Sequence, residues 1–497
     1  MKKHEKFLIY QILTRLYGNH QCKHPVPHGS IQVNGSEKFS GFTMQTLEEI
    51  RRMGVTHVWY TGTFEHASTT AYPEAGIQGD PPEVVKGIAG SPYAVRDYYD
   101  VNPDLAEDVH HRMEEFEALI DRTHKAGLKV IIDFIPNHVA RNYHSDIKPE
   151  TDFGPENYFI LADGSRLYGS PDWYDTVKLN YTDDTRCKML DILLFWANKG
   201  VDGFRCDMAE MVPLDFWAWV IPKVKEQSDV LFIAEVYQPH LYRPYLYEGQ
   251  FDYLYDKVGL YDTLRAVIRG EIPAARISYC LEELSDIRPR MLHFLENHDE
   301  QRIASSFFAG DALRAFPAMI LIATVSTSPF MIYFGQEVGE PGNDAEGFSG
   351  LDGRTSIFDY WSLCVDPLND YQAQIRNFYA KLCHIALTER AITEGLYYNL
   401  TSFINPAGYA YFRYLGEELI LVVLNFSDTA AKFVINIPQH AFEFCGIPDN
   451  KAMEAIDLFT GERRLAALTQ IYPYSVAVQG YGGKVIKFKL LAHNKPI

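Results

Sequence analysis

The sequence lacks the cysteine patterns that build disulfide frameworks or zinc sites. Seven cysteines, an odd number, are spread over 497 residues without a CxxC pair. Free thiols in a reducing compartment are the simplest interpretation, so we expect a cytoplasmic protein. The basic start of the chain is followed by a short, interrupted apolar run without a small-residue cleavage site. This pattern predicts a first strand instead of a signal peptide.

Long apolar segments and an excess of basic residues are missing as well. The most apolar segment, residues 312–325, contains Arg314 and Pro317 and is too short to span a bilayer, so we expect a buried helix there. The 46 Lys and Arg residues stand against 65 Asp and Glu residues, a formal net charge of −19. This balance argues against nucleic acid and against anionic membranes as partners.

Short strands that end on acidic residues recur along the chain. Such strands end at Asp133, Asp207, Glu235 and Glu296. Apolar runs near residues 7, 56, 129, 202, 230, 251, 291 and 330 give about eight strands that alternate with helical patterns. Such runs are typical of parallel strands buried on both faces. The alternation predicts an α/β fold, a (β/α)8 TIM barrel with its active site at the C-terminal strand ends. An open doubly wound sheet is the alternative, but no Gly-rich phosphate loop follows the first strand.

Two changes of pattern indicate additional domains. Residues 139–181 are irregular and rich in Gly, Pro, Asp and Tyr, which predicts a small subdomain inserted after the third strand. After about residue 394 the sequence alternates apolar and polar residues between turn signals, as antiparallel strands do. We therefore predict the barrel in residues 1–138 and 182–393, the inserted subdomain in 139–181, and a C-terminal antiparallel β-sandwich in 394–497.

The segment Val201–Asp207 predicts a functional pair of charges. Arg205 and Asp207 lie two residues apart, so their side chains point to the same face of a strand. Arg205 would hold Asp207 ionised, as a nucleophile or charge stabiliser requires. A surface Arg–Asp pair at a strand end is the alternative interpretation of this segment by itself.

The barrel mouth would gather several more polar side chains. The candidates are Asp133, His138, Arg205, Asp207, Glu235, His298 and Asp299. The sequence shows neither a Ser-His-Asp arrangement nor a His/Cys cluster with metal spacing. Several carboxylates at one mouth suit a reaction through a cationic transition state. Glycoside cleavage is the leading case, with one carboxylate as nucleophile and another as proton donor.

Four motifs follow one another in a characteristic order. They are Asp133-Phe-Ile-Pro-Asn137-His138, Gly203-Phe-Arg205-Cys-Asp207, Glu235 at a strand end, and Asn297-His298-Asp299, with a fifth and weaker match in Val177-Lys178-Leu179-Asn180. In order and spacing the chain resembles the α-amylase family (glycoside hydrolase family 13) over nearly its whole length.

This resemblance implies roles for the three acids. Asp207 is expected to be the nucleophile that forms a covalent glycosyl intermediate. Glu235 is expected to be the general acid/base, and Asp299 the carboxylate that supports the transition state. A proton donor near two other carboxylates should have a raised pKa, because like charges disfavour ionisation.

The resemblance also implies the groups that bind substrate. His138 and His298 match histidines that hydrogen-bond the sugar in the reacting subsite, and Arg205 matches the arginine that positions the nucleophile. Tyr93 is located where the family places a stacking aromatic, with ordinary loop packing as the alternative. Asp133 is expected to support the site without acting in the reaction.

The chain departs from the family at positions that bind calcium. Many α-amylases carry Lys-His three and four residues after the nucleophile, whereas this chain has Glu210-Met211. Residues 18–23 lack the alternating acids of the other common calcium loop, and Asn137 alone is weak evidence. We therefore expect no cofactor and no metal site, with a structural calcium ion disfavoured. Met208 fits neither the usual 1,4- nor the usual 1,6-linkage pattern, so linkage preference stays open.

Three functions are compatible with these observations. The first is a retaining α-glycoside hydrolase that acts on starch, glycogen or maltooligosaccharides. The second is a transglycosylase or glucosyl isomerase of the same family, in which a sugar intercepts the intermediate instead of water. Phe216-Trp217-Ala-Trp219 resembles maltosyltransferase members, although such a run is also typical of a helix core. The third is a non-catalytic sugar-binding relative, since fold does not imply function.

Overall fold

Eight parallel strands form the central sheet of the computed structural model, which describes residues 6–19, 25–342, 352–363, 367–405 and 408–491. The strands are β1 (Leu8–Leu13), β2 (His57–Thr61), β5 (Lys129–Phe134), β8 (Gly203–Cys206), β9 (Leu231–Ala234), β10 (Tyr253–Tyr255), β11 (Met291–Leu292) and β12 (Phe330–Tyr333). All eight lie where the sequence predicted a strand. Their side chains are almost all buried, which explains why the apolar runs are continuous.

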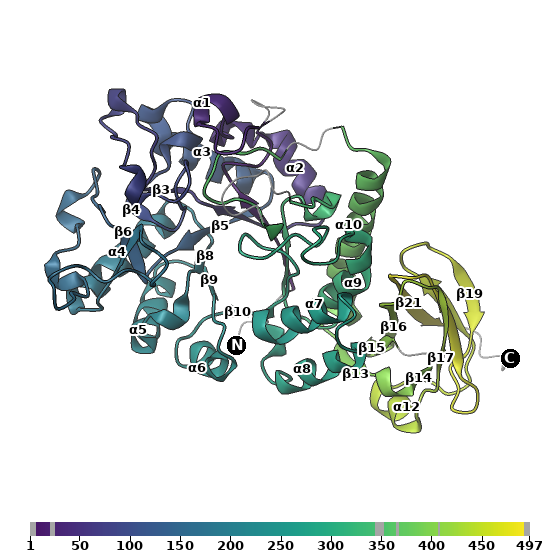
Figure 1. Ribbon diagram of the computed structural model, residues 1–497. Helices are drawn as coiled ribbons and strands as arrows, with labels where there is room; N and C mark the ends of the chain where they lie inside the picture. The colour runs from purple at the N-terminus through teal and green to yellow at the C-terminus, as the bar shows by residue number, and fades with distance from the viewer. Residues whose placement is uncertain (1–5, 20–24, 343–351, 364–366, 406–407, 492–497) are drawn as a thin grey trace.

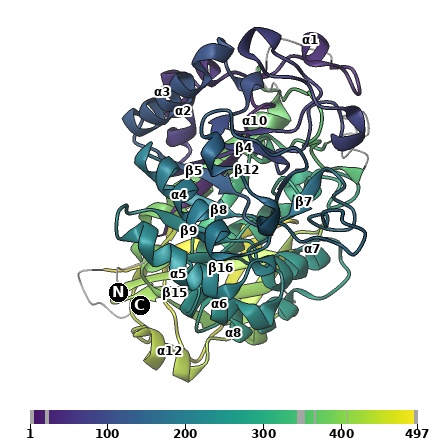
Figure 2. The same cartoon turned by 90° about the vertical axis from the view of Figure 1, so that its left-hand side faces the viewer.

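The sheet closes on itself. The strand order is β11-β10-β9-β8-β5-β2-β1-β12, so β11 and β12 are its two ends. A parallel bridge joins His293 to Phe330 across these ends. The backbone N–H of His293 donates to the carbonyl of Pro329 at 3.2 Å, and that of Met331 to the carbonyl of His293 at 2.9 Å. The barrel is therefore confirmed over the open sheet, and helices surround it in both views (Figures 1 and 2).

Helices of the first part of the chain include α1 (Ile31–Asn34), α2 (Met44–Arg52), α3 (Arg112–Lys125), α4 (Asp183–Asn198), α5 (Leu214–Lys225) and α6 (Tyr242–Tyr247). Further along are α7 (Asp262–Ile268), α8 (Ile277–Glu283), α9 (Phe316–Thr324), α10 (Asp370–Thr388) and α11 (Arg390–Thr393). Helix α3 shows how such a helix covers the barrel. It buries Phe116, Leu119 and Ile120 on one face, and Gly127 just beyond it adopts a φ of +78° that suits glycine.

The apolar segment 312–325 is a buried helix, as predicted. It begins as a 3-10 turn, Ala312–Ala315, and continues as α9, in which Pro317 to Thr324 are all buried. Helix α9 lies between the barrel and the C-terminal sheets. Among the described residues, no helix has the length and apolarity needed to cross a membrane.

Two long loops on the barrel contain small sheets of their own. After β2, strands β3 (Phe64–His66) and β4 (Val95–Val101) pair antiparallel, which the sequence did not indicate. After β5, strands β6 (His138–Ala140) and β7 (Thr176–Lys178) pair antiparallel, and the segment between them has short 3-10 turns but no α-helix. The exact boundaries of the inserted subdomain stay a prediction.

Two antiparallel sheets make up the C-terminal part. The larger contains β13 (Leu396–Asn399), β15 (Tyr409–Leu415), β16 (Glu418–Asn425), β21 (Gly482–Leu490), β18 (Met453–Asp457) and β19 (Arg463–Ala466). The smaller contains β14 (Ile404–Asn405), β17 (Ala431–Ile435) and β20 (Tyr474–Val478), and α12 (Gln439–Cys445) follows β17. Both sheets contribute side chains to one core, for example Phe412 and Val423 from the larger sheet and Phe433 and Val476 from the smaller. This is the β-sandwich that the alternation predicted.

Arg413 of β15 ties this domain to the barrel. Its side chain is buried, and its guanidinium donates to the carbonyl of Val325, just beyond α9, at 2.9 Å. It also donates to the carbonyls of Ala391, Ile392 and Gly395 at 3.2, 2.9 and 2.7 Å. Burial lowers the pKa of Arg413 to about 9. The guanidinium can be buried here because four backbone carbonyls accept its hydrogen bonds.

Replacing Arg413 should therefore weaken the whole chain. We expect Arg413→Met to lower the free energy of unfolding by at least about 3 kcal/mol, because buried carbonyls lose their donor. Arg390→Met is the matched control, since the Arg390 side chain is 62% exposed, and it should change stability by less than about 0.5 kcal/mol. Urea unfolding followed by circular dichroism measures both. Equal stabilities for the two variants would contradict this account.

Candidate functional site

The predicted acids meet at one end of the barrel. Asp207 follows β8 directly and Glu235 follows β9 directly, and these strands pair in parallel with Cys206 opposite Ala234. A cavity of about 710 Å³ opens there, lined by Tyr93, His138, Asp207, Glu235, His298 and Asp299 among others. Six of the seven residues predicted for catalysis and substrate binding thus face one cavity. Arg205, the seventh, lies beneath it with 1% of its surface exposed.

Arg205 contacts three carboxylates at once. Its Nη1 donates to Asp207 Oδ1 at 2.8 Å, and its Nη2 is 2.7 Å from Glu235 Oε1. Asp133 Oδ1 lies 3.5 Å from Nη1, and Nε donates to the hydroxyl of Tyr255 at 3.2 Å. One buried cation therefore offsets much of the charge repulsion among these acids.

Asp207 and Glu235 have displaced pKa values because they are buried together. Burial raises the pKa of Asp207, and Arg205 partly offsets that shift. Burial also raises the pKa of Glu235, where Arg205 lowers it and the charge of Asp207 raises it further. Two such carboxylates share their protons as a pair. Ionisation of one therefore disfavours ionisation of the other.

Asp299 lies at the mouth of the cavity. Its side chain is 39% exposed, and its carboxylate is 3.1 Å from His298 Nε2. Loss of water around it and then the charge of Glu235 raise its pKa. The side chain of Asn297 fixes this turn, because its Oδ1 accepts the backbone N–H groups of Asp299 and Glu300 at 2.9 and 3.0 Å.

His298 belongs to a chain of hydrogen bonds. Gln11 Nε2 donates to His298 Nδ1 at 2.8 Å, which leaves the proton on Nε2. His298 Nε2 is 2.6 Å from the Tyr93 hydroxyl, and that hydroxyl donates to Asp133 Oδ1 at 3.2 Å. Burial lowers the pKa of His298, so the ring is neutral. The ring of Tyr93 stacks on His298 with 5.1 Å between centroids.

His138 also lines the cavity. Burial lowers its pKa to about 4, so it too is neutral and can donate or accept a hydrogen bond. The ring of Trp173 lies 5.1 Å away, and Asn137 Nδ2 is 3.1 Å from His138 Nδ1. Asp133 is buried deeper, where Trp59 Nε1 donates to its Oδ2 at 3.0 Å.

Sequence reasoning missed several groups that face this cavity. Tyr237 donates from its hydroxyl to Glu235 Oε1 at 2.6 Å, and Trp173 and Lys257 also line the cavity. Tyr237 follows Glu235 by two residues, the spacing that identified Arg205 and Asp207. The same reasoning applied after Glu235 would have found it. Trp173 lies in an irregular segment and gave no comparable signal.

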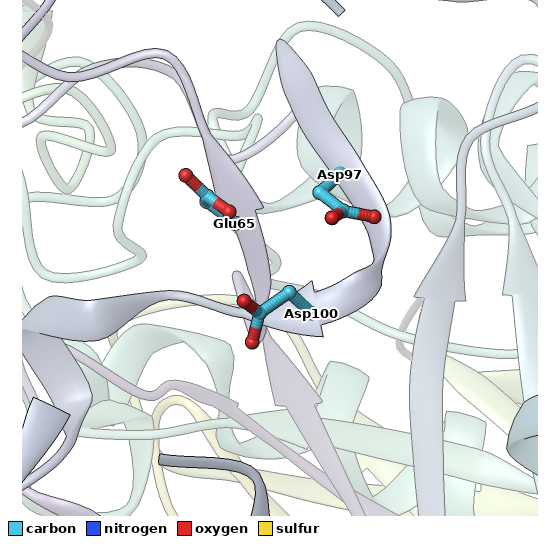
Figure 3. A group of neighbouring side chains, drawn as sticks. All are labelled: Glu65, Asp97 and Asp100. Carbon is cyan, nitrogen blue, oxygen red and sulfur yellow. The ribbon is translucent and has the colours of Figure 1, made fainter. Parts of the chain in front are cut away.

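One buried acidic group lies outside the cavity (Figure 3). Glu65 of β3 and Asp97 and Asp100 of β4 bring their oxygens within 4.8 Å of one another, a spacing that could hold a metal ion. Two cations already oppose them: Arg112 donates to both oxygens of Asp100, and Arg96 is 3.7 Å from Glu65. We assign the group a structural role in the loop after β2.

Backbone N–H groups satisfy Asp97, whereas Glu65 Oε1 is buried without a hydrogen-bond partner among the described residues. The two oxygens of Asp97 accept the N–H groups of Tyr99 and Asp146 at 2.7 and 3.0 Å. Burial raises the pKa of Glu65 to about 8 and that of Asp97 to about 6. Protonation of Glu65 would reduce the remaining negative charge without an ion.

Comparison with known proteins agrees with this arrangement. The family model described as "Alpha amylase, catalytic domain" matches residues 34–357. "Alpha-amylase 3" from Dictyoglomus thermophilum is 26% identical over 389 residues, which are 69% of this chain and 76% of that protein. "Alpha-1,4-glucan:maltose-1-phosphate maltosyltransferase" from Cereibacter sphaeroides is 25% identical over 401 residues, which are 75% of this chain and 54% of that protein.

A solved structure covers the chain almost end to end. The crystal structure of "a noncanonic maltogenic alpha-amylase AmyB" from Thermotoga neapolitana aligns with a TM-score of 0.73 at 23% identity, covering 98% of this chain and 99% of that one. The family model covers well over half of the 497 residues and includes every candidate site residue. The chain therefore belongs to the α-amylase family.

Proposed function

We propose that this glycosidase hydrolyses α-glucosidic bonds in α-glucans or maltooligosaccharides with retention of configuration. The observation that carries the proposal is the meeting of Asp207, Glu235 and Asp299 in one cavity above Arg205. Retaining glycosidases need a carboxylate nucleophile and a carboxylic acid on opposite sides of the scissile bond. The homologues named α-amylase support this substrate class.

Asp207 is suited to attack the anomeric carbon. Its hydrogen bond to Arg205 at 2.8 Å favours the ionised form and aims Oδ1. The sugar would become linked to Asp207 as a β-glycosyl ester, which water then hydrolyses.

Glu235 is suited to donate and then accept the proton. Burial and the charge of Asp207 raise its pKa, so it holds a proton while Asp207 is ionised. Once Asp207 has reacted its charge is neutralised, and the pKa of Glu235 falls. The same residue can then take a proton from the attacking water.

Three further side chains are suited to bind the reacting sugar. Neutral His138 and His298 line the cavity together with Tyr93, whose ring is held by its stacking on His298. Asp299 is exposed enough to meet sugar hydroxyls. Its pKa is raised to about 8, and in its ionised form it would stabilise an oxocarbenium ion. We propose that Asp133 stays a supporting residue.

Transglycosylation is the second candidate. The match to a maltosyltransferase over 75% of this chain favours it. Both reactions share the intermediate on Asp207 and differ in the acceptor that resolves it. Chromatography of products from maltohexaose separates them: hydrolysis gives only shorter chains, whereas transfer also gives longer ones. A purely sugar-binding role fits less well, because all three carboxylates are present and convergent.

We propose a cytoplasmic location. Cys187, Cys206, Cys280, Cys383 and Cys445, the cysteines that the structure describes, are all free thiols. Such thiols persist in a reducing compartment. The net charge of −19 supports a neutral glucan over nucleic acid or an anionic membrane as partner.

We also propose that the enzyme works without a metal ion. Glu210, where many family members carry Lys, accepts the backbone N–H groups of Tyr237 and Gln238. The buried acid Asp175 has its own cation, because Lys86 Nζ lies 3.3 Å from Oδ1. Asn137 Oδ1 is buried without a hydrogen-bond partner and is the atom that a calcium ion would satisfy. Residues 20–23 of the first loop lie outside the described residues.

Asp207→Asn tests the nucleophile. We expect the fold to remain and turnover of maltohexaose to fall by several orders of magnitude, because an amide oxygen does not form the glycosyl ester. Asp215→Asn is the control, since the Asp215 side chain is 72% exposed, and it should keep normal turnover. A folded Asp207→Asn protein with near-normal activity would rule out this assignment.

Stereochemistry tests the mechanism. Because β8 and β9 are neighbours, Asp207 and Glu235 can approach to about 5–5.5 Å, the separation of retaining enzymes, whereas inverting enzymes need about 6.5–9.5 Å. The first product should carry the α-configuration. Proton NMR of the product before mutarotation measures this, and a β-anomer appearing first would reject the mechanism.

Chelation tests the absence of a metal requirement. Dialysis against EDTA should leave both the melting temperature and the turnover unchanged. A melting temperature that falls with EDTA and returns with calcium would contradict this. Asn137→Ala and Glu65→Gln would then locate the ion, because the variant that removes its ligand should lose the response to EDTA.

A further inference from the structure

We propose that Glu210 is a positioning residue that holds Tyr237 so that the tyrosine hydroxyl controls when Glu235 is protonated. The proposal rests on the acid/base role of Glu235 proposed above. It gives a function to Glu210, the position at which this chain departs from many α-amylases. It also assigns a role to Tyr237, which lines the cavity beside Glu235.

Both oxygens of Glu235 have donors. Tyr237 donates from its hydroxyl to Oε1 at 2.6 Å, and the backbone N–H of Met208 donates to Oε2 at 2.7 Å. Arg205 Nη2 also lies 2.7 Å from Oε1. Donors on both oxygens stabilise the carboxylate more than the carboxylic acid, because only the carboxylate accepts strongly at both.

Glu210 fixes the backbone that carries Tyr237. Its Oε2 accepts the N–H of Tyr237 at 3.0 Å and that of Gln238 at 3.1 Å. These two N–H groups lie beyond the end of β9, whose pairing with β8 and β10 extends to Ala234 in the described structure. A single carboxylate oxygen therefore holds the turn in which Tyr237 reaches back to Glu235.

The turn after β8 carries both Met208, which contacts Glu235, and Glu210, which contacts Tyr237. Met208 adopts a φ of +41°, a left-handed conformation that is uncommon for a residue with a side chain. Its N–H donates to Glu235 Oε2, and the next N–H, that of Ala209, donates to the carbonyl of Glu235 at 3.0 Å. Trp217 Nε1 donates a hydrogen bond to the carbonyl of Ala209 at 3.1 Å. Glu210 follows at once, so one short turn positions both the acid and its tyrosine.

Charged and titratable groups face Glu235 from several strands. Arg205 and Asp207 approach from the end of β8, Tyr255 from β10, Asp299 from the loop after β11, and Tyr237 from its own strand end. Burial raises the pKa of Glu235 first, then Arg205 lowers it and Asp207 raises it, and the hydroxyl of Tyr237 lowers it further. Tyr237 donates a hydrogen bond to Glu235. In the part of the chain that the structure describes, it makes no hydrogen bond to Asp207, whose partner is Arg205. It can therefore tune the acid while leaving the nucleophile in place.

The pH profile of kcat/KM on maltohexaose tests the proposal. The alkaline limb reports the loss of the proton from the general acid. Tyr237→Phe removes a donor that favours the ionised form, so the pKa of Glu235 should rise and the alkaline limb should move up by roughly one pH unit. The acidic limb, set by the nucleophile, should stay in place.

Two variants of Glu210 separate positioning from simple stability. Glu210→Ala frees the two N–H groups and should move the alkaline limb in the same direction as Tyr237→Phe. Glu210→Gln keeps an oxygen that can accept them, so its alkaline limb should match the unmodified enzyme. The double variant Glu210→Ala/Tyr237→Phe should move the limb no further than Tyr237→Phe does. Should Glu210→Ala fail to fold, Glu210→Ser, whose shorter side chain also withdraws the acceptor, takes its place. An unmoved alkaline limb in that variant would overturn the positioning role of Glu210.

A substrate with a good leaving group distinguishes failure of this proposal from failure of the proposed function. Fluoride needs little protonation to leave, so Glu235→Gln should still release a first-turnover burst of fluoride from α-maltosyl fluoride and then turn over slowly, because the variant lacks the base that activates water. Its turnover of maltohexaose should be lost, because that leaving group needs the acid. Full activity of Glu235→Gln on maltohexaose would overturn the acid/base role itself. If Glu235→Gln behaves as expected but the alkaline limb of Tyr237→Phe is unmoved, the positioning role alone is overturned.

Discussion

The contact between the buried guanidinium of Arg205 and the carboxylates around it is the interaction on which the site depends. Asp133, Asp207 and Glu235 could not be buried side by side without a cation, because each would remain protonated or the strands would separate. Burial alone would lower the pKa of Arg205, but Glu235 and its other neighbours raise it well above the usual value. The cation and the acids keep each other charged.

The barrel fixes where these groups lie. Parallel pairing places Asp133 opposite Arg205, and Cys206 opposite Ala234, so the next residues along the two strands are Asp207 and Glu235. Closure of the sheet between β11 and β12 brings the loop with His298 back toward Gln11 of β1. Backbone hydrogen bonds thus set the distances, and the chemistry follows from the side chains that end each strand.

Much of this could be predicted because strands leave a strong signal. Residues such as Val130, Ile131 and Ile132 form an apolar run that has few alternatives to a buried parallel strand, and Asp133 stands out as an acid at the end of that run. Polar residues in irregular loops leave no such signal. The grouping of Glu65 with Asp97 and Asp100 depends on two antiparallel strands that a long loop separates in the sequence, so the buried group was not expected.

The sequence by itself determined the eight strands, the β-sandwich, and the acids that end the strands, because these depend on local periodicity and on order along the chain. Only the tertiary structure decided which groups touch. Glu210 and Tyr237 are 27 residues apart, and their contact exists because a short turn after β8 meets the end of β9. The protonation of Glu235 is likewise set in three dimensions, since burial and the charges of neighbours from other strands act through space and not along the sequence.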